Sequence, residues 1–117
     1  MRLRILYLED NAAFAEQACR FFLAEHDVTI VPSQLAATSA MADHAYDVLL
    51  ADYDLEVGKG DPVVREFRRK YPGKPIIAVS SHAAGNRSLQ EAGASLVCSK
   101  MEFDKIGAIL EKLHPTG

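Results

Sequence analysis

A run of four apolar residues that ends abruptly in an aspartate most strongly limits what this sequence can fold into. Val48 to Ala51 lie between Asp47 and Asp52, and so short a run is typical of a strand rather than a helix. Continuous apolar strands belong to parallel sheets that are covered on both faces. Open parallel sheets bind their ligands beyond the carboxyl ends of the strands. We therefore expect Asp52 to lie at a ligand-binding edge, as an acceptor or a metal ligand.

The rest of the chain alternates between short apolar runs and segments of helical periodicity. Strands are expected at 3–8, 28–31, 47–52, 76–79 and 95–99. Of the five expected helices, the first ends near Glu25, the second spans 34–44, the third spans 61–71, the fourth ends at Ala92 and the fifth spans 103–113. Five strands that alternate with five helices require parallel pairing with right-handed crossovers. The sequence therefore predicts a doubly wound α/β fold, with a five-stranded parallel sheet between two helical layers.

Helical spacing also predicts which side chains face the core. In the first helix they are Phe14, Ala18, Phe21 and Phe22, and in the second Leu35, Ser39 and Ala42. Asp61 is the expected N-cap of the third helix, with Pro62 at its first position.

Length and composition favour one soluble domain over residues 1–117. The net charge is −3, which argues against direct binding to nucleic acid. No apolar run approaches the ~20 residues of a membrane span, and none resembles a signal peptide. We therefore expect a cytoplasmic protein with no membrane contact. Cys19 and Cys98 form no CxxC pair and are interpreted as reduced, packed thiols.

Polar residues that could carry chemistry follow four of the expected strands. They are Glu9, Asp10, Asp52, Ser80 and Lys100, and in a parallel sheet all of these strand ends point the same way. Three crowded carboxylates repel one another unless a cation relieves them. Oxygen ligands without histidine or cysteine suit Mg²⁺. A lysine and a hydroxyl facing an acid and a metal indicate a site for a phosphoryl group.

Five sequence features in this order resemble the receiver domain of bacterial two-component response regulators. They are the acidic pair after the first strand, the DVLLAD run, Gly60 eight residues past Asp52, the PIIAVS strand, and AGA followed by Lys100. The resemblance covers the whole chain. It implies a flavodoxin-like three-layer sandwich with strand order 2-1-3-4-5.

The resemblance also implies an acceptor and a metal site. Asp52 would receive a phosphoryl group from a sensor histidine kinase or a phosphotransfer protein. Mg²⁺ would be held by Glu9, Asp10, the Asp52 carboxylate and the main-chain carbonyl of Asp54. Beyond self-phosphorylation and self-dephosphorylation with Mg²⁺, no enzymatic activity is expected. The partner downstream would be a protein, and the chain itself a monomer or weak dimer.

The same resemblance assigns roles to four further side chains. Ser80 and Lys100 would each bind a phosphoryl oxygen. Asp54 and His82 occupy positions that line the approach of the attacking water, so we hypothesise that they tune the lifetime of the acyl phosphate.

Three departures from the family pattern lie near the usual output surface. Met101 stands where a proline after a cis peptide is expected, and a cis bond before a non-proline residue costs ~2.5–4 kcal/mol, so a trans Lys100–Met101 bond is predicted. Val97 replaces an aromatic residue that turns inward on activation, and valine is stiff at χ1. The interval from Ser80 to Gly93 is shorter than usual. These changes leave open a receiver that acts without phosphorylation.

A third interpretation comes from another class of protein. Asp52-Tyr53-Asp54 forms a DxD at a strand end, and with Ser80 and Lys100 it is similar to phosphatases of the haloacid dehalogenase type. That family opens with the DxD strand, whereas here a complete strand and an acidic pair come first.

Overall fold

The computed structural model describes residues 2–113, and its strands and helices alternate along the chain. The strands are β1 (Arg4–Leu8), β2 (Asp27–Val31), β3 (Val48–Ala51), β4 (Ile76–Ala78) and β5 (Leu96–Val97). The helices are α1 (Ala12–Phe22), α2 (Gln34–Asp43), α3 (Asp61–Lys70), α4 (Ala83–Ala92), the 3-10 helix η1 (Lys100–Lys105) and α5 (Ile106–Leu113). Every predicted element is present, although the first helix and the fifth strand are shorter than expected.

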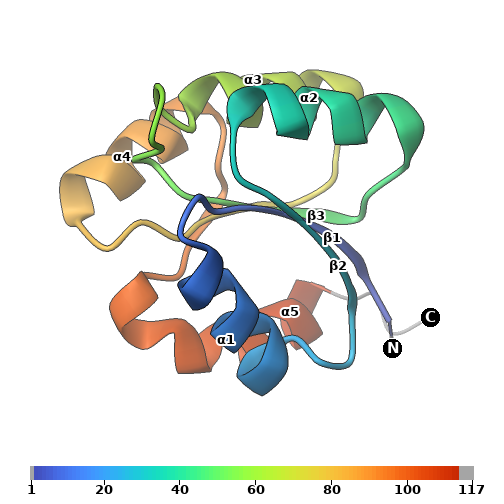
Figure 1. Ribbon diagram of the computed structural model, residues 1–117, viewed down its shortest axis with the longest axis vertical. Coiled ribbons are helices and arrows are strands. Elements are labelled where there is room, and N and C mark those ends of the chain that lie inside the picture. Colours follow the sequence, from blue (N-terminus) through green and yellow to red (C-terminus); the bar gives the residue numbers. More distant parts are fainter. Residues whose placement is uncertain (1, 114–117) are drawn as a thin grey trace.

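All five strands pair in parallel, in the order β2-β1-β3-β4-β5. The predicted sheet and strand order are therefore confirmed. Figure 1 shows α2, α3 and α4 on one side of the sheet and α1 and α5 on the other. The acidic end of β3 lies in the middle of the sheet, beside β1, with Leu8 opposite Ala51.

Each face of the sheet contributes alternate residues to a separate core. Leu49 and Ala51 pack under α2, α3 and α4, whereas Val48 and Leu50 pack against α1 and α5. Successive strand residues point to opposite faces, so a strand covered on both sides must be apolar at every position. This arrangement explains the uninterrupted apolar run of β3.

The core-facing side of α1 differs from the prediction. Ala15 and Ala18 are buried, whereas Phe21 is 68% exposed and Phe22 40% exposed. The buried stripe is centred between the two alanines, whose small side chains let the helix lie close to the sheet. Phe21 falls at the edge of that stripe and reaches solvent.

The predicted face of α2 is wrong. Leu35, Ser39 and Ala42 are all exposed, and the buried pair is Ala37 and Met41. Apolar and small residues lie all around this helix, so the sequence pattern carries no directional signal.

The cap of α3 also differs from the prediction. Gly60 is the N-cap, without a side-chain cap bond, and Asp61 and Pro62 are the first two helical residues. A Cβ at Gly60 would lie 1.9 Å from the main-chain oxygen of Asp52. The loop after β3 therefore fits only glycine at the cap, and the helix starts one residue earlier than predicted.

None of the helices within residues 2–113 has the length and apolar character that crossing a bilayer requires.

Candidate functional site

Residues from three strand ends meet at the carboxyl edge of the sheet. The Lys100 ammonium lies 2.7 Å from Glu9 Oε1 and 2.9 Å from Asp52 Oδ2. Glu9 and Asp52 are both buried, and the lysine side chain is only 18% exposed. The fold therefore brings an acid from β1, an acid from β3 and a base from beyond β5 into one ion-paired group.

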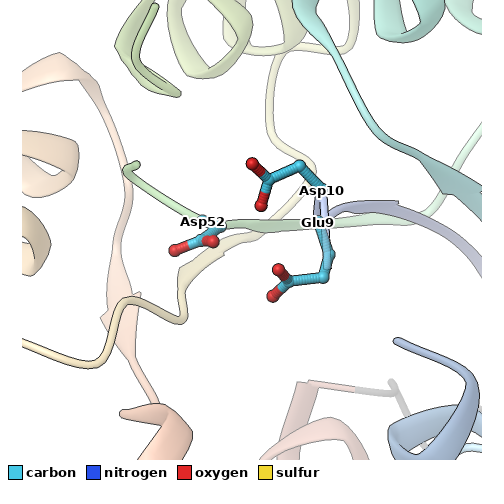
Figure 2. A group of neighbouring side chains, drawn as sticks. All are labelled: Glu9, Asp10 and Asp52. Atoms are coloured by element: carbon cyan, nitrogen blue, oxygen red, sulfur yellow. The ribbon is translucent and has the colours of Figure 1, made fainter. Parts of the chain in front are cut away.

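Three carboxylates share this edge. Glu9, Asp10 and Asp52 each offer an oxygen, and these oxygens lie within 4.8 Å of one another. Figure 2 shows the three carboxylates directed to the same side of the strand ends. Close-set carboxylate oxygens are the donor set that a hard divalent cation such as Mg²⁺ prefers. The residues present therefore fit such an ion.

Main-chain hydrogen bonds orient the two buried carboxylates. Asp52 Oδ1 accepts from the amide of Tyr53 at 2.8 Å, and Glu9 Oε2 accepts from the amide of Asn11 at 3.0 Å. Asn11 is the N-cap of α1 and accepts from the Phe14 amide. The start of α1 thereby fixes where the Glu9 carboxylate points. In each of these two acids, one carboxylate oxygen accepts a hydrogen bond from a main-chain amide and the other oxygen pairs with the ammonium of Lys100.

Burial and pairing act in opposite directions on the charges of this group. Burial raises the pKa of Glu9, although hydrogen bonds from Lys100 and Asn11 oppose that rise. For Lys100, burial lowers the pKa, but hydrogen bonds to Glu9 and Asp52 outweigh burial and raise it overall. The lysine therefore remains a cation and supplies the counter-charge for the two buried acids.

Ser80 lies at the end of β4, next to the end of β3, and is buried. The amide of Val79 donates to the carbonyl of Ala51, which extends the pairing of the two strands to this point. The backbone of Ser80 is held by Asn86 of α4, a residue to which the sequence assigned no role. Asn86 lies three residues before the buried Leu89, on the same side of α4. A polar residue on an otherwise apolar helical stripe was the signal in the sequence that could have identified it.

Asp54 and His82 do contact each other, but at the rim and not at the buried acids. Asp54 Oδ2 lies 2.7 Å from His82 Nε2, and its Oδ1 lies 2.5 Å from the ammonium of Lys59. His82 Nδ1 accepts from the Gly85 amide, so Nε2 carries the proton that is donated to Asp54. Hydrogen bonds from Lys59 and His82 lower the pKa of Asp54. Neither spacing nor a motif singles out Lys59 in the sequence.

The loop that carries Lys100 has the predicted backbone. The Lys100–Met101 peptide bond is trans, and Lys100 opens η1, where the Ser99 hydroxyl accepts from the Met101 amide. Met101 is 80% exposed and Val97 39% exposed. Neither side chain contributes to the buried core.

Comparison with known sequences gives one curated relative, and no family model matches the chain. The relative is the response regulator protein FleR of Pseudomonas aeruginosa, which is 24% identical over 91 residues, or 77% of this chain. The match spans 19% of FleR, so this chain covers about a fifth of the length of that protein.

Solved structures share the whole architecture. The chemotaxis response regulator CheY4 of Vibrio cholerae has a TM-score of 0.83 at 16% identity, over 97% of this chain and 100% of that one. A CheY-like receiver domain protein of Methanospirillum hungatei has a TM-score of 0.81 at 21% identity, over 97% and 94%. The Mn²⁺-bound form of response regulator Rcp1 has a TM-score of 0.74 at 17% identity, over 98% and 97%. The chain therefore has the receiver-domain fold.

Proposed function

We propose that this chain, with its receiver-domain fold, is a phosphorelay receiver that accepts a phosphoryl group on Asp52. The donor would be a phosphohistidine of a sensor kinase or a phosphotransfer protein. One observation carries the proposal: the buried Asp52 carboxylate has a lysine on one oxygen and two further carboxylates within 4.8 Å. A structural ion pair would need the lysine but would be weakened by two further carboxylates beside Asp52, whereas a site for a divalent cation uses them.

In the transfer step, a carboxylate oxygen of Asp52 attacks the phosphorus of the donor. The new O–P bond forms as the P–N bond breaks, and the imidazole leaves with the electron pair and later gains a proton from water. Lys100 pairs with one phosphoryl oxygen and the Ser80 hydroxyl donates to another. Hydrolysis reverses the state of Asp52: water attacks phosphorus, the O–P bond breaks, and carboxylate and inorganic phosphate result.

Glu9, Asp10 and Asp52, with the main-chain carbonyl of Asp54, would hold Mg²⁺. When bound, the ion neutralises charge that develops on the phosphoryl oxygens. Two observations support this assignment: the three carboxylates lie close together, and the similar Rcp1 is described in a Mn²⁺-bound form.

Asp54 and His82 would set the lifetime of the acyl phosphate. Their side chains bridge the loops after β3 and β4 at 2.7 Å, and each is about half exposed. A hydrogen-bonded pair of side chains at the rim can order or obstruct the water that attacks phosphorus. We expect Asp54→Ala and His82→Ala to change the dephosphorylation rate, and the assignment fails if neither does.

An apolar groove beside Lys100 suits contact with protein partners. It has a volume of about 350 Å³ and lies between α1 and η1, with Phe21 and Met101 among its exposed lining residues. Exposed apolar patches often mark sites of protein contact, and the net charge of −3 argues against nucleic acid. We therefore propose a kinase or phosphotransfer protein upstream, a protein target downstream, and a cytoplasmic location.

The deciding experiment incubates the protein with acetyl phosphate and Mg²⁺ and measures its intact mass. We expect one added phosphoryl group, none on Asp52→Asn, and none without the divalent ion. A folded protein that never gains the group would contradict the proposal and favour a receiver that binds partners without phosphorylation. Repeated turnover of a phosphate monoester would instead indicate a phosphatase of the haloacid dehalogenase type.

A further inference from the structure

Asn86 is a buried polar residue outside the set that the proposed chemistry uses. Within residues 2–113, the buried polar or charged residues are Glu9, Asp52, Ser80 and Asn86. The first three belong to the candidate site. Buried amides require hydrogen-bond partners, and both partners of this one belong to Ser80.

The Asn86 side chain forms a two-point clamp on the Ser80 backbone. Its Oδ1 accepts from the Ser80 amide at 2.8 Å, and its Nδ2 donates to the Ser80 carbonyl at 3.1 Å. The primary amide thus pairs with one residue's N–H and C=O, as a neighbouring strand would. Both polar groups of the Ser80 main chain are satisfied from α4.

The sheet itself holds Ser80 only weakly. On the β5 side, the last paired residue of β4 is Ala78, opposite Val97. Beyond it, Ser80 itself has one main-chain contact with that side, from the Lys100 amide to the Ser80 carbonyl at 3.4 Å. That separation is long for an N–H···O bond. The position of Ser80 is therefore set mainly by α4, through Asn86.

The first turn of α4 also lies directly against the Ser80 hydroxyl. A Cβ at Gly85 would come within 2.6 Å of Ser80 Oγ, so a larger residue there would displace the Ser80 hydroxyl. His82 caps this same turn by accepting from the Gly85 amide. Ser80 and the start of α4 therefore form one packed unit.

We propose that Asn86 is the positioning residue for Ser80, and that it ties the phosphoryl-binding hydroxyl to α4. This inference rests on the proposed function. A movement of Ser80 toward a phosphoryl group on Asp52 would pull α4 through the two hydrogen bonds. The route does not need an aromatic side chain in β5, where Val97 is 39% exposed.

A double-mutant cycle tests this role. The variants are Ser80→Ala, Asn86→Leu and their combination, and the readout is the rate of Asp52 phosphorylation by acetyl phosphate with Mg²⁺. We expect Asn86→Leu to slow phosphorylation about tenfold, as expected for the loss of one or two hydrogen bonds. The double variant should be no slower than Ser80→Ala. Once the Ser80 hydroxyl is removed, the loss of Asn86 can no longer misplace it. Rates that multiply would assign Asn86 a merely structural role and overturn the inference.

Ser88→Ala is the matched control, because Ser88 lies on the same helix but donates to Asp61 of α3 at 2.6 Å. We expect it to keep the wild-type rate, and an equal slowing there would also overturn the inference. If Asn86→Leu fails to fold, Asn86→Asp repeats the cycle, since it keeps the acceptor for the Ser80 amide and loses the donor to the carbonyl. A wild-type rate in that variant would count against the inference.

The outcomes separate the two proposals. If wild-type Asp52 gains no phosphoryl group, the proposed function fails and this inference with it. If Ser80→Ala reacts at the wild-type rate, the role of Ser80 and the inference both fail, while Asp52 remains the acceptor. If Ser80→Ala is slow but independent of Asn86, only this inference fails.

Discussion

Replacing Lys100 by methionine should reveal how far the candidate site depends on an internal cation. The lysine side chain is 18% exposed and lies between side chains of Glu9 and Asp52 that are 0% and 5% exposed. Methionine preserves much of the apolar stem and removes only the ammonium. Two buried carboxylates would then face each other without a counter-charge.

Removing one partner of a buried ion pair typically costs about 3–5 kcal/mol, against a total stability of roughly 5–15 kcal/mol for a domain. With a urea m-value of about 1–3 kcal/mol/M, the midpoint should fall by at least about 1 M. A divalent cation at one hundred times its Kd would restore about 2.7 kcal/mol. Because the ammonium of Lys100 no longer repels a cation from these carboxylates, Mg²⁺ should bind the variant more tightly and stabilise it more than it stabilises the wild type.

The loss should also depend on pH. Because burial raises the pKa of Glu9, the folded state binds that proton more readily than the unfolded state. This contribution to stability is fully present below the pKa that Glu9 has in the unfolded chain. It is lost as pH rises through the pKa that Glu9 has in the folded protein. Lys100 is among the groups that lower the Glu9 pKa, so its removal shifts this loss to higher pH. Acidification should therefore recover stability in the variant more than in the wild type.

The assay is urea unfolding followed by far-ultraviolet circular dichroism, since the chain has no tryptophan. It is run with and without Mg²⁺, at about pH 5 and at about pH 8. Both pH values lie above the ordinary pKa values of aspartate and glutamate. Lys70→Met, at an exposed position of α3, is the control and should behave as wild type. A Lys100→Met midpoint equal to that of the wild type without Mg²⁺, or one that Mg²⁺ leaves unchanged, would refute the reasoning.

Three further substitutions test separate parts of the structure. Gly60→Ala places a methyl group 1.9 Å from the Asp52 carbonyl oxygen, so thermal unfolding should show a loss of about 3 kcal/mol or more; an unchanged Tm would contradict the observed loop. Tyr7→Phe removes a buried hydroxyl that has no hydrogen-bond partner within residues 2–113, so stability should stay constant or rise by up to about 1 kcal/mol, and a clear loss would disprove this. Lys59→Ala removes the main group that lowers the pKa of Asp54, so a carboxyl titration followed by NMR should show that pKa rising, and an unmoved titration would exclude the contact in solution.

The sequence determined the class of fold and which acids and which lysine meet at its edge. Residues 48–51 are all apolar because β3 is buried on both faces, and that pattern is typical of a covered parallel sheet. The acids and the lysine could be recognised from their places after strands, because the carboxyl ends of parallel strands share one edge. The strand order followed from the resemblance to receiver domains, not from these local patterns.

The sequence could not say which side of α2 is buried. Ala37 and Met41 face the core while Leu35 is exposed, although all three are apolar or small. Helical periodicity selects a face only when polar and apolar residues segregate around the helix. In α2 they do not, so packing against the sheet and α3 made the choice.

Only the tertiary structure decided how Ser80 is held and how the rim is paired. The Asn86 clamp joins residues six positions apart, and the contact of His82 with Asp54 joins residues 28 apart. Such bonds exist only once α4 has docked on the end of β4. A one-dimensional pattern records which residues are polar and how they are spaced along the chain. The distances between elements that packing brings together are set by the summed contacts of both cores.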